Sequence, residues 1–191
     1  MLAPILLEGR LIQRELFNSR KSVDNGVSSC WDEPFPEDLL PRWQRWKDQL
    51  NLLNNLTGSR SFYTREILPI IKRELFVYSD ASITSVGFCI FLRCVGENGI
   101  DASLVCAGSK LAPRAAVSVP RLELVAAVEA SAAALKVKEE LQVGQSDIYY
   151  YTDSRIVIGY LTNTERRFKR YVGRRIELIS NMTARSEWHC L

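Results

Sequence analysis

Two different periods of hydrophobic and polar positions divide the chain near residue 74. Within residues 5–17 and 36–53, apolar side chains recur every three or four positions, a spacing that predicts amphipathic helices. The second of these stretches carries its tryptophans and leucines on one face. We therefore expect residues 1–73 to form a helical connection segment whose apolar faces are covered.

From residue 74 onward, short apolar runs replace the helical spacing. Residues 75–79, 86–92 and 102–107 are predicted to be strands, and Glu97-Asn98-Gly99 gives a turn signal between the last two. Apolar residues occupy both faces of the first two runs, which is typical of strands in the middle of a covered sheet. The three strands are expected to form an antiparallel meander.

A long helix and a fourth strand are predicted after the meander. The alanine-rich stretch 121–141 contains no glycine or proline, and it follows a proline, a favoured first helical residue. Residues 148–152 form the next apolar run, and shorter helices are expected over 154–161 and 168–182. A strand that returns through a helical crossover would lie parallel to the first strand, which gives a mixed sheet.

The composition is typical of a soluble globular protein. Of the 191 residues, 47% are hydrophobic and 25% are charged, which argues against a disordered or membrane-spanning chain. The apolar start, Leu2 to Leu7, contains Pro4, lacks a basic lead-in and stops at Glu8, so it is neither a secretory signal nor a spanning helix. A cytoplasmic or nuclear location is expected, with no membrane partner.

The five cysteines and the single histidine limit the chemistry that the chain can support. The cysteine count is odd and no CxxC pair occurs, which argues against a disulfide framework and a structural zinc site. We expect reduced thiols, with Cys89 and Cys106 in the core. Because His189 is the only histidine, a Ser-His-Asp triad or a multi-histidine metal site is disfavoured.

Three acidic residues occupy positions that could meet at one site. Asp80 closes the first predicted strand, Glu123 lies within the first turn of the long helix, and Asp153 closes the fourth strand. Open sheets bind ligands at the carboxyl ends of such strands. Three clustered carboxylates repel one another unless a cation neutralises them, and oxygen ligands alone favour Mg²⁺ or Mn²⁺. The pattern predicts a catalytic metal site suited to phosphodiester hydrolysis.

A structural interpretation of the same acids is also open. Asp153 could cap the following helix, Glu123 could complement the helix dipole, and Asp80 could stabilise a turn. Two further acids are interpreted as surface residues. Asp101 starts a strand after a turn, and Glu129 lies roughly 9 Å along the helix from Glu123 at about 1.5 Å per residue.

A run of basic residues gives the chain a local positive charge that its net charge of +3 does not reveal. Aromatic residues are interleaved in this run, and it contains no acid. Phosphate backbones attract such a stretch, although a solvated helix face is the alternative. The candidate nucleic-acid-binding residues are Arg166, Arg167, Lys169, Arg170, Arg174 and Arg175.

Several of these segments, taken in order, resemble one family. They are Leu2-Ala3-Pro4, Leu11-Ile12-Gln13-Arg14-Glu15-Leu16, Trp31-Asp32-Glu33-Pro34, Pro41-Arg42-Trp43, Tyr78-Ser79-Asp80-Ala81-Ser82, Ser109-Lys110-Leu111-Ala112-Pro113, Val119-Pro120-Arg121-Leu122-Glu123-Leu124 and Tyr151-Thr152-Asp153-Ser154. Together they are similar to the region of BEL/Pao-type retrotransposon polyproteins that follows the reverse-transcriptase core. The ordered set carries the resemblance, which covers nearly the whole chain.

The resemblance implies an α/β fold over residues 74–191, preceded by the helical segment 1–73. The expected fold is a ribonuclease H-like mixed sheet with three antiparallel strands, a parallel fourth strand and a truncated fifth. The implied activity is metal-dependent hydrolysis of RNA in RNA/DNA hybrids, with Asp80, Glu123 and Asp153 matching the first three metal-binding acids. The reverse-transcriptase portion of a parent polyprotein is the implied protein partner.

The resemblance also implies an absence, since the family places a fourth acid on a helix that would follow Leu191. Three acids could hold one ion but would position a second one poorly. Three functions therefore stay open at this point. They are a hybrid-directed endonuclease that requires Mg²⁺ or Mn²⁺, a non-catalytic nucleic-acid-binding module, and an inert retrotransposon relic.

Overall fold

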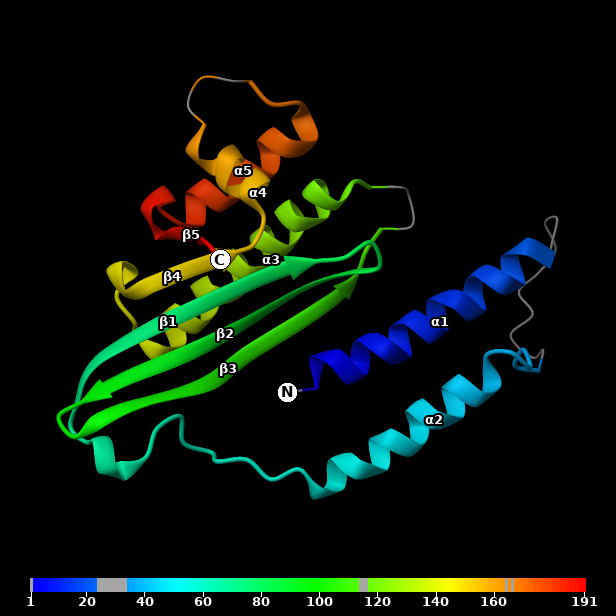
Figure 1. Cartoon of the computed structure of the whole chain (residues 1–191), viewed down its shortest axis with the longest axis horizontal. Coiled ribbons are helices and arrows are strands. Elements are labelled where there is room, and N and C mark those ends of the chain that lie inside the picture. The colour runs from blue at the N-terminus through cyan, green and yellow to red at the C-terminus, as the bar shows by residue number, and fades with distance from the viewer. Residues whose placement is uncertain (1, 24–33, 114–116, 164, 166) are drawn as a thin grey trace. The chain divides into compact units, whose positions relative to one another are not determined.

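Five strands form one mixed sheet, against which a long helix is packed (Figure 1). The computed structural model describes residues 2–23, 34–113, 117–163, 165 and 167–191, with the backbone alone for residues 20–23. The chain folds as two compact units, residues 2–58 and residues 59–191. The second unit contains the whole sheet.

The sheet has the strand order β3-β2-β1-β4-β5. Its strands are β1 (Ile70–Ala81), β2 (Ser85–Gly96), β3 (Gly99–Leu111), β4 (Ile148–Thr152) and β5 (Trp188–Cys190). The first three strands pair in antiparallel fashion, whereas β4 runs parallel to β1 and β5 parallel to β4. The predicted meander and the parallel return of the fourth strand are confirmed.

Helix α3 (Val119–Leu141) packs across β1 and β2. Alanine favours the helix and also keeps its buried side thin, so the helix axis can approach the sheet closely. Ala127, Ala130 and Ala134 are fully buried and share one core with Leu75 of β1 and Ile148 of β4. The alanines that favour the helical conformation of α3 therefore also form one side of the main core, packed against the sheet.

The opposite face of the sheet carries a row of aromatic rings. Phe76 stacks on Tyr149 with ring centroids 5.3 Å apart, and Tyr78 stacks on Tyr151 at 5.1 Å. Tyr78 also meets Phe91 of β2 edge to face. Side chains alternate between the two faces of a strand, so these rings lie on the side away from the alanine-rich helix. Such ring pairs stabilise the joining of β4 to the meander by about 0.5–1.5 kcal/mol each beyond the area that they bury.

Two helices and a short strand complete the second unit. Helix α4 (Arg155–Thr162) follows β4, and α5 (Arg170–Met182) packs against α3 and α4. In β5, the Trp188 ring stacks on Tyr150 with centroids 4.9 Å apart, and its Nε1 donates a hydrogen bond of 2.9 Å to Oγ1 of Thr183. This buried tryptophan fixes the three-residue β5 beside β4.

The first unit is a pair of helices, α1 (Ala3–Val23) and α2 (Leu40–Asn51). Arg42 of α2 joins the two through ion pairs with Glu8 and Glu15 of α1, with N–O distances of 2.9 and 2.7 Å. The hydrogen bonds to Glu8 and Glu15 stabilise the protonated guanidinium and therefore raise the pKa of Arg42. One arginine therefore bridges carboxylates two turns apart on α1.

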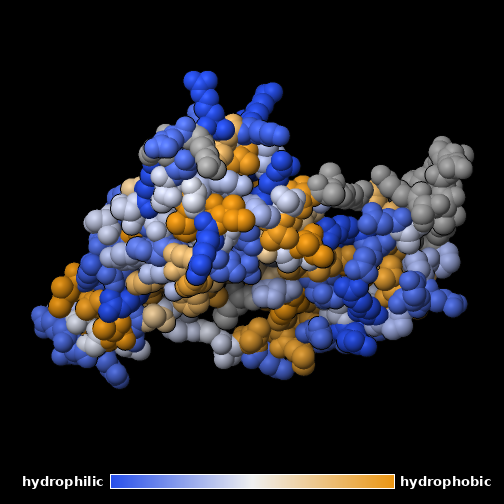
Figure 2. All heavy atoms as spheres, turned by 45° about the horizontal axis from the view of Figure 1, so that its top comes forward, coloured by the Kyte–Doolittle hydropathy of each residue, from blue (hydrophilic) through white to orange (hydrophobic). Residues whose placement is uncertain are grey.

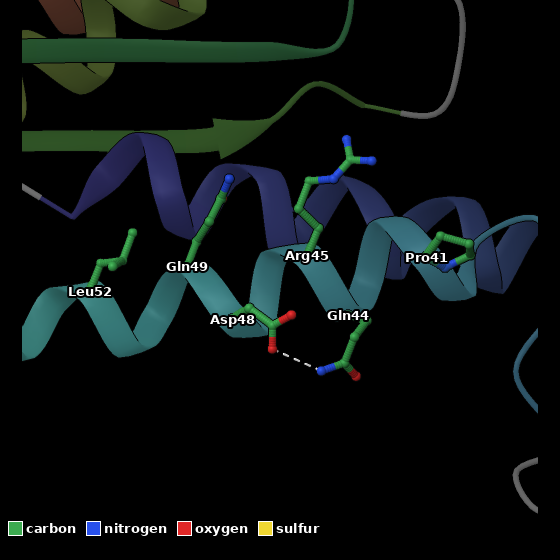
Figure 3. Close-up of a pocket in the computed structure, with 6 residues that line it drawn as sticks. All are labelled: Pro41, Gln44, Arg45, Asp48, Gln49 and Leu52. Carbon is green, nitrogen blue, oxygen red and sulfur yellow. Dashed lines mark hydrogen bonds between the residues drawn. The ribbon is translucent and has the colours of Figure 1, made fainter.

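Trp46 sets the spacing between these helices. Its indole Nε1 donates a hydrogen bond of 2.8 Å to the backbone oxygen of Ile5, and a Cβ at position 9 would clash with the indole ring, so Gly9 allows the close approach. A hollow of about 610 Å³ lies along α2, where Gln44 donates a hydrogen bond to Asp48 (Figure 3). The hollow is lined by Pro41, Gln44, Arg45, Asp48, Gln49 and Leu52.

Several element boundaries differ from the sequence prediction, among them the end of β2, which continues to Gly96. Helix α1 continues to Val23, past the predicted end at Phe17. Strand β1 already begins at Ile70, inside the segment predicted to be a helical connection, and β3 runs beyond the predicted 102–107 at both ends. The extension of α1 is mostly polar, and the added parts of β1 and β3 mix apolar with polar or glycine residues, so backbone hydrogen bonds continue these elements without a clear periodic signal in the sequence.

The four cysteines that the structure describes are free, and Cys30 lies outside the described residues. Cys94 is fully buried. Cys89 and Cys106 were expected in the core, but each is half-buried on its strand. Within the described part of the chain, no helix combines the length and the apolar character that crossing a bilayer requires.

Candidate metal centre

The register between β1 and β4 brings Asp80 and Asp153 to the same edge of the sheet. The two strands are parallel, and the last pair in their register is Tyr78 with Tyr151. Each aspartate lies two residues beyond its tyrosine, so the two carboxylates emerge at the same height along the strands. Both aspartates are exposed.

Glu123 enters the same place from helix α3. The helix begins at Val119, so Glu123 lies just after the first turn. The sequence had predicted a place within that turn. The leucines on either side of Glu123 are buried, and the glutamate itself is 7% exposed. One carboxylate oxygen from each of Asp80, Glu123 and Asp153 lies within 4.8 Å of the other two. The structure therefore brings the three sequence-predicted acids together.

The position of Glu123 makes its negative charge costly in the absence of a cation. Burial, and secondarily the charges of Asp80 and Asp153, raise the pKa of Glu123 from 4.5 to about 7, although a hydrogen bond from the backbone of Ala81 opposes the rise. Its Oε2 atom is buried and has no hydrogen-bond partner among the described residues, and the Oγ atom of Ser79 is in the same condition. Buried acceptors of this kind are normally satisfied.

These features fit a hard divalent cation. All three side chains offer carboxylate oxygens, and the cluster contains neither histidine nor thiolate. Mg²⁺ and Mn²⁺ prefer such ligands, whereas zinc sites use nitrogen or sulfur as well. A cation between the carboxylates would also give the orphaned Oε2 of Glu123 a partner and remove the repulsion that raises its pKa.

A family model described as the Pao retrotransposon-like RNaseH-like domain matches residues 1–154. The chain belongs to this family. The match extends over α1, α2, the meander, α3 and β4, and it ends at the residue after Asp153. It confirms the resemblance drawn from the ordered motifs, and the mixed five-stranded sheet is the ribonuclease H-like sheet that the resemblance implied.

Solved structures similar to the Pao-type domain include two kinds of protein. One is ribonuclease H1 from the halophilic archaeon Halobacterium salinarum, with 19% identity, a TM-score of 0.36, and coverage of 62% of this chain and 83% of that one. Another is the foamy viral protease-reverse transcriptase in complex with double-stranded DNA, with 17% identity, a TM-score of 0.44, and coverage of 94% of this chain. The chain spans about a third of the length of that viral protein, at 33%. No curated protein matches the chain significantly.

In the Pao-type domain, the structural roles considered for the acids are filled by Ser154, which caps a helix, and by Glu129, which forms an ion pair. Ser154, not Asp153, caps α4, because its side chain accepts a hydrogen bond from the backbone nitrogen of Val157 over 3.4 Å. Glu129 is held by Lys110, with an N–O distance of 2.6 Å. The cap is made without Asp153, so that carboxylate stays available for a ligand.

Asp101 repeats the local sequence of Asp80 but has a different environment. Its Oδ2 atom accepts hydrogen bonds from the backbone nitrogen and the hydroxyl of Thr64, at 2.6 and 2.9 Å. It therefore anchors the segment before β1 to the start of β3. The tripeptide Asp-Ala-Ser alone does not distinguish an anchoring acid from an acid of the cluster.

The cap at Ser154 offers a test of how firmly the turn after Asp153 is held. We expect Ser154→Ala to lower the free energy of unfolding by about 1 kcal/mol, since loss of an N-cap side chain leaves a backbone N–H unsatisfied. Ser154→Asp should restore most of the loss, because aspartate caps equally well. Urea denaturation of the three proteins measures this effect, and equal midpoints would show that the cap does not hold the turn.

The basic residues of the Pao-type domain gather at the start of α5. Lys169 is the N-cap residue, Arg170 and Arg174 are exposed on the helix, and Arg175 is half-buried. Arg167 is exposed in the preceding connection, whereas Arg166 lies outside the described residues. In Figure 2, long hydrophilic side chains project from the α4–α5 end of the unit. Among the described residues of this run, none forms an ion pair with an acid.

Two residues that are close to the acids in the sequence were not singled out from it. Ser79 precedes Asp80, and its buried hydroxyl has no described partner. Arg121 precedes Glu123 by two residues and lies over the ring of Tyr171, 5.3 Å from its centroid. A strand serine next to a conspicuous acid could have suggested the first. The second depends on the packing of α3 against α5, which local sequence does not reveal.

Proposed function

We propose that Asp80, Glu123 and Asp153 bind Mg²⁺ or Mn²⁺, and that the domain hydrolyses the RNA strand of RNA/DNA hybrids. The observation that carries the proposal is the meeting of three carboxylates within 4.8 Å around a buried Glu123 whose pKa is about 7. Membership of the Pao retrotransposon-like RNaseH-like family supports the choice of substrate. The reverse-transcriptase portion of a parent polyprotein is the proposed supplier of such hybrids.

A bound divalent cation supplies an activated water and neutralises the charge that develops on the leaving oxygen. The residues of the chain prepare the site for this chemistry. Glu123 lies between two buried leucines on α3 and is itself buried, which limits the movement of its side chain. Asp80 accepts a hydrogen bond of 2.7 Å from the backbone nitrogen of Ala81, which restricts its rotation. The exposed sides of Asp80 and Asp153 leave room for a duplex phosphate to approach.

Cleavage of a labelled strand in three kinds of duplex and in single-stranded RNA tests this function. We expect the RNA strand of an RNA/DNA hybrid to be cut in Mg²⁺ or Mn²⁺, whereas single-stranded RNA, RNA duplex and DNA duplex are spared. Chelation with EDTA should stop the cleavage, and Ca²⁺, which prefers a larger and looser ligand shell, should support it poorly. Metal-independent cleavage, or equal cleavage of all four substrates, would contradict the proposal.

A non-catalytic nucleic-acid-binding module is the second candidate, favoured by the unpaired basic run at the start of α5. Neutralising Arg167, Lys169, Arg170 and Arg174 to glutamine is expected to weaken hybrid binding. The dependence of log K on log salt should become shallower by up to about 0.9 for each phosphate contact removed. Fluorescence anisotropy at several salt concentrations measures both effects. Unchanged affinity and slope would show that the run is merely a solvated helix face.

A further inference from the structure

The ring of Tyr171 in α5 contacts two guanidinium groups, one from its own helix and one from α3. The Cζ atom of Arg175 lies 3.6 Å from the centroid of the ring, and the Cζ atom of Arg121 lies 5.3 Å from it. Arg175 is fixed further by a hydrogen bond of 3.0 Å from Nη1 to the backbone oxygen of Tyr171. A single tyrosine therefore gathers two positive charges that are 54 residues apart in the sequence.

Two neighbouring arginines are normally neutralised by a carboxylate, and this pair has none among the described residues. Like charges repel, and a ring face compensates only part of that repulsion. Among the described residues, neither Arg121 nor Arg175 forms an ion pair with a carboxylate. A cation–π contact uses none of the N–H donors of an arginine as a hydrogen bond to a carboxylate would, and a guanidinium has five of them. Such donors match the oxygens of a phosphate.

The pair joins the start of α3 to the first half of α5. Arg121 lies two residues before Glu123 on α3, which is about 3 Å along the helix axis. Side chains two residues apart are about 200° apart around a helix, so Arg121 and Glu123 leave nearly opposite sides of α3. Tyr171 and Arg175 belong to the helix that begins the basic run. Arg121 thus extends the positively charged start of α5 onto the first turn of α3, the helix that also carries Glu123.

We propose that Tyr171 is a positioning residue that holds Arg121 and Arg175 as a phosphate-binding pair for the backbone of the hybrid. The inference rests on the proposed function for the identity of the ligand, a phosphodiester of the hybrid backbone. The ring limits the freedom of both guanidinium groups, so less conformational entropy is lost when a phosphate binds. Arg121 thereby joins the candidate nucleic-acid-binding residues.

Tyr171→Leu and Tyr171→Phe separate the role of the ring from that of the hydroxyl. Binding of a fluorescent RNA/DNA hybrid is measured in Ca²⁺, at about 0.1 M salt and across a salt series. Tyr171→Leu should weaken binding by about tenfold, because the guanidinium groups are released, whereas the conservative Tyr171→Phe keeps the ring and should bind nearly as the natural chain does. Thermal melts of both variants check that the fold is retained.

A double-mutant cycle then tests whether the tyrosine acts through the arginines. In the Arg121→Gln/Arg175→Gln background, Tyr171→Leu should cause little further loss, and the salt slope should already be shallower by about one to two. Arg185→Gln, the same charge change at an exposed position in another element, is the matched control. Equal losses in Tyr171→Phe and Tyr171→Leu, or full additivity in the cycle, would overturn the inference.

Cleavage assays and binding assays test the two proposals separately. A domain that binds the hybrid in a tyrosine-dependent way but never cuts it would refute the proposed hydrolysis and leave the phosphate-binding pair standing. A domain that cuts the hybrid while Tyr171→Leu binds like the natural chain would refute the pair alone. Failure of the natural chain to bind any duplex would refute both.

Discussion

Asp80→Asn is expected to lower the rate of hybrid cleavage in Mg²⁺ by on the order of 100-fold or more, because displacement of a reacting group by about 1 Å already has an effect of that size. The substitution keeps the volume of the side chain and its hydrogen bond to Ala81, but it removes one negative charge from the cluster. Single-turnover cleavage measures the chemical step directly. Asp153→Asn should have a similar effect, since the two aspartates occupy equivalent positions in the register of β1 and β4.

Asp101→Asn is the matched control for this experiment. Asp101 stands in the same tripeptide as Asp80, and the amide oxygen that replaces its carboxylate can still accept hydrogen bonds from Thr64. Cleavage by this variant should stay within about twofold of the natural rate, because the residue belongs to no acidic cluster. If Asp80→Asn cut the hybrid as fast as Asp101→Asn, the acidic cluster would not be the catalytic site.

Asp80→Asn should also leave the affinity for the hybrid intact, or raise it slightly, because it removes a negative charge near the substrate phosphates. This outcome distinguishes a loss of chemistry from a loss of binding. A drop in affinity equal to the drop in rate would mean that Asp80 supports the structure of the binding surface. Binding in Ca²⁺ and a thermal melt of the variant settle this point.

The meeting of Asp80 and Asp153 could be predicted because it depends on few choices. Once β4 returns through a helix, its direction relative to β1 is set, and acids at the carboxyl ends of parallel neighbours must emerge together. The exact register, Tyr78 beside Tyr151, could not be read from the sequence, since it depends on how the two aromatic rows stack. The sequence thus predicted that Asp80 and Asp153 share an edge of the sheet, but not the distance between their carboxylates.

The environment of Glu123 could not be predicted in the same way. The sequence places an acid near the start of a helix, which also fits an ordinary favourable interaction with the helix dipole. Its burial depends on the small alanines of α3, which let the helix settle onto β1 and β2. Likewise, the basic run was visible as charge, whereas the approach of Arg121 to Tyr171 requires α3 and α5 to be packed together. Tertiary packing decides both features.

In the absence of divalent cations, the stability of the domain is expected to fall as the pH rises from about 4.5 to above 7, by up to about 3 kcal/mol relative to Glu123→Gln. Glu123 has its pKa raised from 4.5 to about 7, chiefly by burial and then by Asp80 and Asp153. The folded state therefore holds a proton that the unfolded chain releases. This contribution is complete below pH 4.5 and is lost as the pH rises through about 7.

Measuring the difference between two proteins isolates this one group. Urea unfolding of the natural chain and of Glu123→Gln in EDTA, at several pH values, cancels the titration of residues that both proteins share. Glu129→Gln is the matched control on the same helix, because Glu129 is paired with Lys110 outside the cluster. Its difference from the natural chain should stay nearly constant with pH over this range.

Divalent cations should reverse the pH effect through the same carboxylate. A cation favours the ionised form of Glu123, so saturating Mg²⁺ or Mn²⁺ at pH 8 should stabilise the natural chain by about 2.7 kcal/mol at a hundred times the dissociation constant. Glu123→Gln should gain clearly less, because it retains only two of the three carboxylates. A pH-independent difference in EDTA combined with equal stabilisation of both proteins by the cation would show that Glu123 is no ligand, and the metal centre would then have to rest on the two aspartates alone.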